Sequence, residues 1–478
     1  MKRPALTLAA VAVVQFMVSL DLSVVNVGLP RIAGGLGFSA VGVTWVINAY
    51  ALAFGGLLLV GGKAADRYGR KRVLLLGLGL FGLASLAGGF AQEPGHLVAA
   101  RAVQGIGAAG LAPAALALLS ATFPGGKARV RAFGVWSAMN AAGGAVGVLL
   151  GGLLTEYASW RWVMFLNVPM AAGTLVLAWR GVAAGPPPVR SGRLDVLGAV
   201  LATGGMSLLV LGVVRTDQHP WTSAITVATL AVAGTLLAAF IYVERAVARE
   251  PLIRLGLLAN RSVAGANAYN LLVGAAMASA FYFVSLYLQR VLGTGPASTG
   301  IEFVPFALGV IAGSIIAVKL GYRIAPRTLL VLGGLLTAFG FAWFGQISSD
   351  GTFITDVLGP SLVTSIGFGL CLGPVVSTAT FGVASDETGT ASGLLNSSRQ
   401  IGAALGLAAL GTVAHDRTGP IATPHALNDG YALGLMLGAT LLLGAVFIAL
   451  TVLPWPAPGR PRRRHPQATL PTPIEEKL

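Results

Sequence analysis

Long apolar stretches separated by short polar segments repeat along the whole chain. Each is about 20 residues long, which as a helix is enough to cross a hydrocarbon layer about 30 Å thick. Period-two alternation of apolar and polar residues is absent, so the pattern predicts helices rather than barrel strands. We count fourteen such spans, centred near residues 17, 52, 82, 108, 143, 171, 203, 232, 274, 307, 336, 365, 405 and 441. The pattern therefore predicts an all-α polytopic membrane protein with fourteen transmembrane helices.

The order of these spans predicts two similar halves. Residues 1–180 hold six spans, and residues 262–453 hold the last six. Between them, residues 181–261 contain a Pro/Gly/Arg linker, two further spans and a charged connector. Residues 454–478 are rich in Pro and Arg, and we expect a disordered cytoplasmic tail there. Internal repeats of this kind build many transporters, so we expect two six-helix bundles plus two inserted helices.

Composition and charge support a membrane protein with a defined orientation. Of the 478 residues, 55% are hydrophobic and 10% are charged, against roughly 25% charged in soluble domains. When Lys and Arg are assigned to alternating sides, 25 of the 32 fall on the side of the N-terminus and 5 on the other. The positive-inside rule then places both termini in the cytoplasm of a multi-pass cell-membrane protein. Topology thus explains the net charge of +15, and we expect no nucleic-acid partner.

Three ionisable residues lie inside apolar spans, away from the span ends: Asp21, Arg101 and Glu302. A charge at a helix centre costs about 2.5–3.5 kcal/mol on insertion scales, so each of them needs a compensating partner or a function. The rise per residue places Asp21 ~13 Å and Arg101 ~9 Å below the same outer surface, where the two can meet. Glu302 lies in the outer half of the tenth span. We therefore expect each half to contribute one carboxylate to a central cavity.

These charges predict a site that couples protons to a substrate. Protonation of a buried carboxylate competes with a cationic substrate for the same negative site, which is the requirement for antiport. We interpret Asp21 as the principal coupling carboxylate, Glu302 as a second one, and Arg101 as the residue that tunes Asp21. The alternative for Asp21 is a purely structural ion pair with Arg101. The alternative for Glu302 is a residue at the wet mouth of its helix.

Other polar residues within the spans are candidates for a substrate cavity. Helix–helix hydrogen bonding explains each of them equally well. These residues are Asn26, Asn48, Tyr50, Gln104, Asn140 and Asn270.

A glycine stripe occupies the fifth span. Gly143, Gly147 and Gly151 recur at every fourth position, which places them on one helix face and lets a neighbouring backbone approach closely. The stripe is either ordinary tight packing or a surface on which two helices slide.

The connector between the second and third spans reads GGKAADRYGRKRVLL. Its glycines permit a tight turn, and its cations agree with positive-inside anchoring. Anchoring does not explain the acid, which could cap the next helix or pair with a cation across the bundle. Such a pair would hold one conformation. The residues of this latch loop are Gly62, Asp66, Arg67, Gly69 and Arg70.

The latch loop resembles the signature G-x-L-A-D-R-x-G-R-K of the major facilitator superfamily, with Ala64 in place of the usual Leu. The segment LVAARAVQGIGAA is similar to the R-x-x-Q-G-x-G motif of that family, and LDLSVVNVGLP resembles L-D-x-T-V-V-N-V-A-L-P of its fourteen-helix drug:proton antiporter branch. WRWVMFLNVP and LLNSSRQIGAALG are also similar to that branch. The resemblance covers residues 5–453 and implies the major facilitator fold.

The fifth span departs from the pattern of that branch. The branch usually carries G-x-x-x-G-P-x-x-G-G, whereas GGAVGVLLGG has Val148 where proline is expected. A proline would remove a helical hydrogen bond and clash with the preceding turn. We therefore expect a straighter fifth helix, and an inference about antiport that rests on the proline is weaker for this chain.

The resemblance implies a proton-coupled efflux antiporter, not an enzyme, that exports amphipathic and cationic drugs or secondary metabolites. Its expected partners are the lipophilic drug, protons and the lipid bilayer, and we expect a monomer. The sequence has no P-loop and no metal-ligand spacing, so we expect no cofactor or metal and a proton gradient as the energy source. One alternative is a facilitator or symporter for a neutral or anionic metabolite on the same fold. Another is a membrane-embedded protein without transport.

Overall fold

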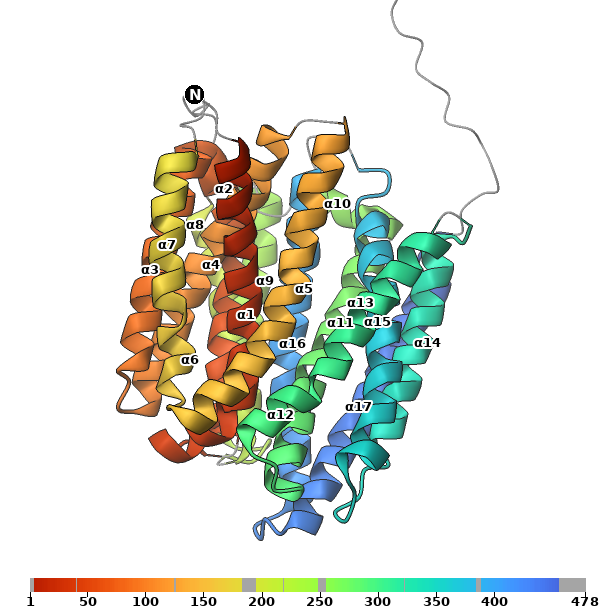
Figure 1. The fold of residues 1–478 in the computed structure, drawn as a ribbon. Coiled ribbons are helices and arrows are strands. Elements are labelled where there is room, and N and C mark those ends of the chain that lie inside the picture. The colour runs from red at the N-terminus through yellow and green to blue at the C-terminus, as the bar shows by residue number, and fades with distance from the viewer. Residues whose placement is uncertain are drawn as a thin grey trace, which may run out of the picture.

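The computed structural model describes residues 4–39, 41–123, 126–182, 195–217, 219–247, 255–321, 323–383 and 388–454. In these residues the regular structure is helical (Figure 1). Thirteen helical segments are long and apolar enough to cross a membrane. The remaining expected span is α16 (Thr388–Thr418), a helix of 31 residues whose polar run between Asn396 and Gln400 makes it less apolar. The predicted all-α membrane fold is therefore confirmed.

The N-terminal half is a bundle in which α1 packs on α5, α2 and α3 pack on α4, and α7 packs on α1 and α3. The sixth span is interrupted at Leu166, so it consists of two helices. The elements are α1 (Pro4–Leu36), η1 (Gly42–Thr44), α2 (Trp45–Tyr68), α3 (Arg70–Gly89), α4 (Pro94–Thr122), α5 (Gly126–Tyr157), α6 (Arg161–Phe165) and α7 (Asn167–Gly181).

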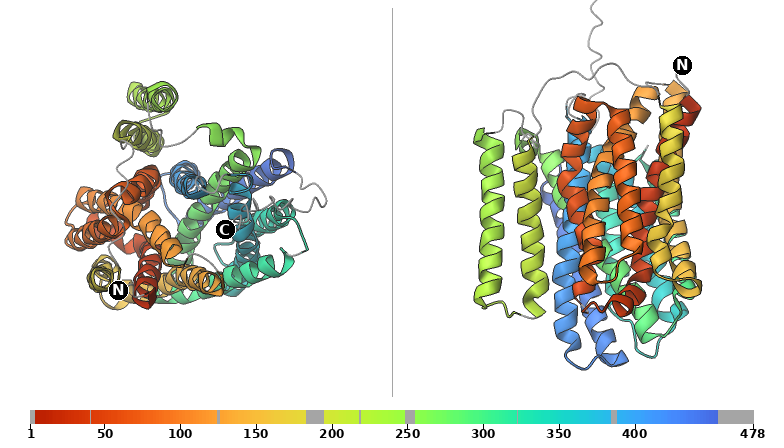
Figure 2. Two further views of the ribbon diagram at one scale, coloured as in Figure 1. Left: turned by 90° about the horizontal axis from the view of Figure 1, so that it is seen from above. Right: turned by 90° about the vertical axis from the view of Figure 1, so that its left-hand side faces the viewer.

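The two inserted spans form a hairpin beside the bundle. Asp195 and Ser223 cap the two helices, because their side-chain oxygens accept hydrogen bonds from the backbone N–H groups of Gly198 and Thr226. The first helix packs on α2 and on α16, and the second lies on the outside of the first (Figure 2). The elements are α8 (Val196–Val214), η2 (Arg215–Asp217), α9 (Ala224–Tyr242), η3 (Val243–Val247) and α10 (Leu255–Ala259).

In the C-terminal half, α11 packs on α16 and α17, and α15 packs on α13 and α14. Several of these helices begin with proline in the first turn, where the missing N–H costs no hydrogen bond. The elements are α11 (Arg261–Leu286), η4 (Tyr287–Val291), α12 (Pro296–Glu302), α13 (Val304–Leu320), α14 (Pro326–Phe344), η5 (Phe353–Leu358), α15 (Gly359–Ala379), α16 and α17 (Pro424–Thr451).

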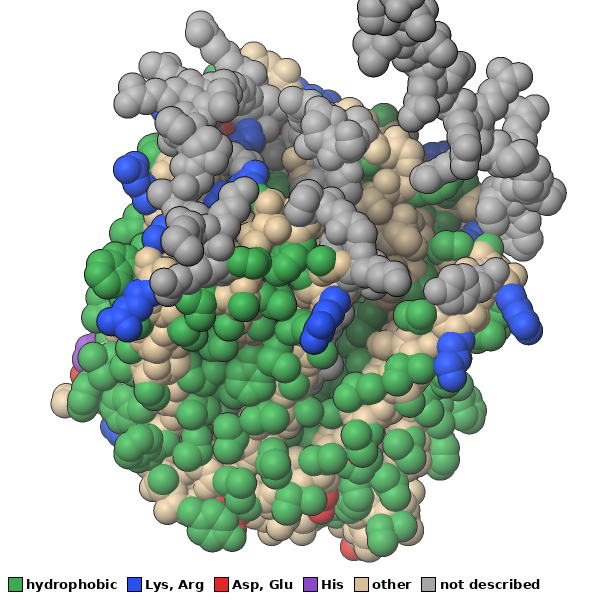
Figure 3. All heavy atoms as spheres, turned by 45° about the horizontal axis from the view of Figure 1, so that its top comes forward, with side chains coloured by type: hydrophobic (Ala, Val, Ile, Leu, Met, Phe, Trp, Pro, Cys, Tyr) green, Lys and Arg blue, Asp and Glu red, His purple; other side chains and the backbone are tan. Residues whose placement is uncertain are grey.

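The molecule has two ends, which we call the N-terminal face, where α1 begins and α17 ends, and the opposite face (Figure 1). Lys and Arg side chains gather near the N-terminal face, whereas hydrophobic side chains cover the sides (Figure 3). The predicted tail beyond residue 454 and the connector at 183–194 lie outside the described residues.

At the opposite face, α1 of the N-terminal half is bonded to α11 and its extension η4 in the C-terminal half. Ser285 Oγ donates to the carbonyl of Asn26 at 3.3 Å, and Gln289 Nε2 donates to the carbonyl of Val27 at 3.0 Å. The largest hydrophobic cluster also contains residues of both halves, among them Val24 and Leu410. The two halves are therefore held together at this face.

A second contact between the halves joins α5 to α12 at the same face. The backbone N–H of Ala297 donates to Glu156 Oε2 at 2.7 Å. A Cβ added at Gly300 would lie 2.9 Å from the carbonyl oxygen of Val148, and one at Gly152 would meet the backbone of Pro296, so the two backbones are in close contact. Toward the N-terminal face, α5 and α13 diverge (Figure 1).

α5 runs as one uninterrupted helix through Val148. Because valine keeps its backbone N–H, the helical ladder has no break at this position. This continuous helix carries contacts with α1 and with α12 on neighbouring faces.

Candidate functional site

Asp21 of α1 and Arg101 of α4 form a buried ion pair. Arg101 Nη1 donates to Asp21 Oδ2 at 2.6 Å. The Asp21 side chain is 0% exposed and the Arg101 side chain is 1% exposed. The structure therefore brings together the two residues that the depth estimate placed at one level. Removing one partner of a buried pair leaves an uncompensated charge, at a cost of about 3–5 kcal/mol.

Two further side chains hold the carboxylate of Asp21. Asn167 Nδ2 donates to Asp21 Oδ1 at 2.7 Å, and Gln104 Nε2 lies 3.4 Å from the same oxygen. Gln104 Nε2 also donates to Ser85 Oγ at 2.5 Å. The cluster therefore joins α1, α3, α4 and α7.

The guanidinium of Arg101 extends the cluster to α2. Its Nε donates to the carbonyl of Val46 at 2.9 Å, and its Cζ lies 4.5 Å from the ring centroid of Tyr50. This distance permits a cation–π interaction. Tyr50, which we predicted as a cavity residue, thus packs on the ion pair.

Asp21 faces into the N-terminal half. Gln15, Ser19 and Asn26 share another part of the α1 surface, at helical spacings of 4 and 7 residues, and all three are partly exposed. Asn26 provides the carbonyl bonded to the C-terminal half. Asp21 is about 140° away from the middle of this face, because each residue turns the helix by about 100°. The expected exposure of Asp21 to a central cavity is therefore absent in this conformation.

Glu302 lies where α12 ends and α13 begins, and its side chain is half-buried. Among the described residues, Glu302 Oε2 has no hydrogen-bond partner although the atom is buried. No hydrogen bond or ion pair of the described residues links Glu302 to the Asp21 cluster. The structure thus does not bring the two predicted carboxylates together.

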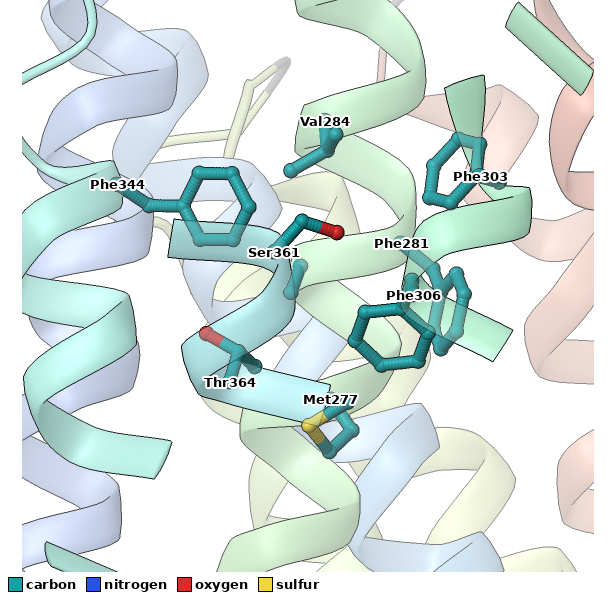
Figure 4. Close-up of a pocket in the computed structure, with 9 residues that line it drawn as sticks. Met277, Phe281, Val284, Phe303, Phe306, Phe344, Ser361 and Thr364 are labelled. Carbon is teal, nitrogen blue, oxygen red and sulfur yellow. The ribbon is translucent and has the colours of Figure 1, made fainter. Parts of the chain in front are cut away.

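An aromatic pocket lies in the C-terminal half (Figure 4). Phe281 stacks on Phe303 with ring centroids 5.7 Å apart and contacts Phe306 edge-on at 5.0 Å. The free volume is about 10 Å³, which is space for roughly one water molecule. The pocket is therefore too small for a drug-sized ligand in this conformation. Its lining residues are Met277, Ala280, Phe281, Val284, Phe303, Phe306, Phe344, Ser361 and Thr364.

The remaining predicted cavity residues have separate environments. Asn48 is fully buried, and neither atom of its amide has a partner among the described residues. Asn140 is exposed, and its Oδ1 accepts a hydrogen bond from Gln15 Nε2 at 2.6 Å. Asn270 Nδ2 donates to the carbonyl of Leu395 at 2.7 Å, which joins α11 to α16. Asn26 Nδ2 donates to Leu22 of its own helix.

The glycine stripe of α5 packs on α1, the helix that carries Asp21. A Cβ at Gly147 would lie 2.7 Å from the carbonyl oxygen of Leu20, and one at Gly151 would lie 2.6 Å from that of Val24. Gly143 approaches the carbonyl of Phe16 in the same way. The spacing of four residues is thus matched on both helices.

The latch loop contacts helices of its own half. Gly69 has φ +97°, a backbone conformation that favours glycine. Arg70 Nη1 donates to the carbonyl of Ala117 in α4 at 3.2 Å. Lys71 Nζ donates to the carbonyl of Trp179 in α7 at 2.7 Å. The loop therefore holds the ends of α4 and α7 that lie at the N-terminal face of the molecule.

Three other residues of this loop were also predicted to belong to the latch. A Cβ added at Gly62 would lie 3.7 Å from Pro113, an ordinary contact distance, and the Arg67 guanidinium lies 5.7 Å from the ring centroid of Tyr68. The side chain of Asp66 lies outside the described residues. A pairing of this acid across the bundle stays a prediction.

Asn167 and Ser85 belong to the cluster although neither was predicted as a site residue. Asn167 stands in WRWVMFLNVP, so the motif itself was a signal, but its spacing does not show that its amide reaches α1. Ser85 lies in an apolar helix and resembles any small packing residue.

Two halves of six membrane-spanning segments each are an arrangement found in many secondary transporters. The family model of the Major Facilitator Superfamily matches residues 11–407. The chain belongs to this superfamily.

Relatives extend along nearly the whole chain. It is 42% identical to the cephamycin export protein CmcT of Amycolatopsis lactamdurans, over 94% of this chain and 92% of the relative. It is 39% identical to the puromycin resistance protein pur8 of Streptomyces alboniger, over 94% and 90%. A crystal structure of a bacterial homologue of the human lysosomal transporter Spinster, inward-facing and unoccupied, matches with TM-score 0.66 and 16% identity over 95% of this chain and 99% of that one.

Proposed function

We propose that this protein exports antibiotics and related amphipathic small molecules across the cell membrane in exchange for protons. The relatives named for cephamycin export and puromycin resistance support the cargo class. The Asp21–Arg101 ion pair carries the coupling part of the proposal, because it places a carboxylate, a possible proton acceptor, inside the membrane-spanning bundle. The protein works as a monomer, with the proton gradient as its energy source.

The N-terminal face is the cytoplasmic one, with both termini in the cytoplasm. The bias of Lys and Arg toward this side supports the orientation. The halves are hydrogen-bonded through Ser285 and Ala297 at the opposite, outer face, and α5 and α13 diverge toward the cytoplasm (Figure 1). In this proposal the described conformation is the inward-facing one, which takes cargo from the cytoplasm or the inner leaflet.

Coupling runs through α1. A proton on Asp21 neutralises the carboxylate and breaks its ion pair with Arg101, which ties α1 to α4 and, through Val46, to α2. The same helix supplies the carbonyl of Asn26 to the contact with the C-terminal half. Protonation therefore acts on the position of the helix that holds the outer face closed. Glu302 is a second proton site in the other half.

The driving force is sufficient for useful export. A proton that crosses 100 mV releases about 2.3 kcal/mol, before any pH gradient is counted. At about 1.4 kcal/mol per factor of ten, one proton supports a concentration ratio of roughly 50. Two protons support more than a thousandfold accumulation outside the cell.

Two packed surfaces guide the movement. The glycine stripe lets α1 and α5 shift against each other without side-chain obstruction. The latch loop, with Gly62, Asp66, Arg67, Gly69 and Arg70, keeps the cytoplasmic ends of α2, α3, α4 and α7 together as one body.

Discharge of a proton gradient tests the proposal. Energised everted vesicles that contain the protein are given puromycin, lincomycin or a cephamycin, and internal pH is followed with a fluorescent dye. At least one antibiotic should discharge the gradient with the wild type and fail to do so with Asp21→Asn. Asp350→Asn, an exposed acid in a loop, is the matched control and should behave as the wild type. If no antibiotic discharges the gradient, or if Asp21→Asn is fully active, the proposed antiport through Asp21 is wrong.

A further inference from the structure

Arg399 is a charged residue of the membrane interior that the coupling mechanism leaves unused. It lies 11 residues after the start of α16 at Thr388, which corresponds to about 16 Å of helix. Its side chain is half-buried. Among the described residues, no acid lies within ion-pair distance of Arg399; the ion pairs found there involve Arg101, Arg417 and His425.

The backbone at Arg399 is fixed by close packing on α11. A Cβ added at Gly274 would collide with the carbonyl of Arg399, and one added at Gly402 would collide with that of Leu271. On another side of α16, Gly55 of α2 approaches Gln400, with 2.8 Å between its added Cβ and the Gln400 Cβ. α16 therefore lies between α2 and α11 (Figure 2, left), which restricts where the Arg399 side chain can point.

One face of α16 shows where the two halves separate. Asn396, Arg399 and Ala403 share this face at spacings of 3 and 4 residues, and they are exposed or half-buried. Further along the same face, Leu407 and Leu410 are buried in the hydrophobic cluster that both halves share. The face is thus closed toward the outer end and open toward the cytoplasm. Arg399 lies on the open part of this face.

The polar side chains of α1 and α5 on the face toward the C-terminal half are neutral. Gln15 of α1 and the exposed Asn140 of α5 are hydrogen-bonded to each other on the face of α1 that looks toward the C-terminal half. Asp21 could have balanced the charge of Arg399, but it faces away from it and is paired with Arg101. Arg399 therefore has no counter-charge from these groups, and among the described residues no ion pair supplies one.

We propose that Arg399 binds the carboxylate of an anionic or zwitterionic amphipathic cargo. This inference rests on the proposed export function and specifies its substrate class. A guanidinium without a protein counter-charge is costly inside a membrane, and a planar carboxylate satisfies it with two parallel hydrogen bonds. The amide groups of Gln15 and Asn140 supply neutral hydrogen-bond partners to the rest of the molecule.

The energetics favour this cargo over a cation. A membrane potential that is negative inside drives an anion outward, whereas a cation has to be moved against it. In antiport the driving force on the entering protons then adds to the driving force on the anion, whereas for a cation it has to offset the work against the potential. The cation expected from the sequence resemblance is thus replaced in this proposal by a cargo that carries a carboxylate.

Matched pairs of acid and ester test the proposal. Rhodamine 110 and its methyl ester rhodamine 123 form one pair, and benzylpenicillin and its methyl ester form the other; within each pair only the carboxylate differs. Initial rates of uptake into energised everted vesicles are compared for the wild type, Arg399→Gln and Arg399→Lys. The control is Arg417→Gln, an exposed arginine at the far end of the same helix.

The wild type and the Arg417→Gln control should take up the acid of at least one pair at least tenfold faster than its ester. Arg399→Gln should lose this preference through a slower rate for the acid, and Arg399→Lys should keep part of it. The proposal is overturned if the wild type prefers the ester or does not distinguish the two, or if Arg399→Gln retains the preference. It is also overturned if no acid is taken up while an antibiotic still discharges the proton gradient. Failure of that discharge as well would overturn the export function itself. A lipid phosphate as the partner of Arg399 would give no acid preference.

Discussion

The carboxylate of Glu156, in the N-terminal half, accepts a hydrogen bond of 2.7 Å from the backbone N–H of Ala297, in the C-terminal half. Ala297 is the second residue of α12, so an acid from one half caps a helix of the other. The bond exists only while the outer ends of α5 and α12 are together.

Loss of this cap should therefore shift the protein toward an outward-open state. Replacing a capping side chain by alanine typically costs about 1 kcal/mol, which corresponds to roughly a fivefold change in population. Ala297 is buried in the closed outer face, so a cysteine placed there reports on opening through its reaction with an impermeant thiol reagent. For Glu156→Ala we expect this reaction to be several-fold faster. Glu93→Ala, an exposed acid in another outer loop, should leave the rate unchanged. An unchanged rate in Glu156→Ala would show that the cap does not hold the outer face.

The buried ion pair predicts that its variants affect the free energy of unfolding and the coupling to protons differently. Asp21→Asn leaves the buried guanidinium of Arg101 without a counter-charge and should cost about 3–5 kcal/mol in free energy of unfolding. The double variant Asp21→Asn/Arg101→Gln removes both charges and should recover most of this loss, but not the discharge of the proton gradient. Thermal unfolding in detergent and the vesicle assay measure the two effects. Recovery of both in the double variant would assign the pair a purely structural role.

The glycine stripe predicts a site-specific effect of a single methyl group. In Gly147→Ala the new Cβ meets the carbonyl oxygen of Leu20 at 2.7 Å, so α5 and α1 have to separate. Export by this variant should be slowed by tenfold or more. Gly144→Ala, three positions away on a neighbouring face, has its first contact at 3.8 Å and should retain the wild-type rate. Equal rates for the two variants would exclude a role of the α1–α5 contact in the rate-limiting step.

The turn at Gly69 predicts a cost from backbone strain. Gly69→Ala places a Cβ on a residue with φ +97° and should lower the free energy of unfolding by about 1–3 kcal/mol. Gly79→Ala, in the middle of α3 with no atom within 4 Å of its new Cβ, should be neutral or slightly stabilising. Thermal unfolding of both variants in the same detergent checks the difference.

The fold could be predicted because the membrane imposes it. A helix that crosses lipid needs about 20 apolar residues, so span positions follow from length and composition alone. The α16 helix shows the limit of that criterion. The helix is continuous, but its polar residues around Arg399 lower its mean hydropathy, so it is not among the thirteen apolar segments. Function places polar residues where the span criterion expects apolar ones.

The sequence predicted how deep in the membrane the site residues lie, but not which side of its helix Asp21 faces. A rise of 1.5 Å per residue put Asp21 and Arg101 at one level. The α1 sequence is apolar on nearly all sides, so no amphipathic pattern indicates that Asp21 faces into its own half. The cap between Glu156 and Ala297 depends on the conformation and on contact between the halves, neither of which a local pattern contains.

The inserted helix α8 touches both halves at once. Thr203 approaches Gly56 of α2, and the carbonyl of Val213 accepts a hydrogen bond from Thr412 of α16 at 3.4 Å. If one half tilts against the other, α8 can follow only one of them unless the α2–α16 seam stays together. We therefore expect the insertion to hold α2 and α16 together along one edge of the molecule, so that opening and closing take place at the far edge, between α5 and the helices α12 and α13.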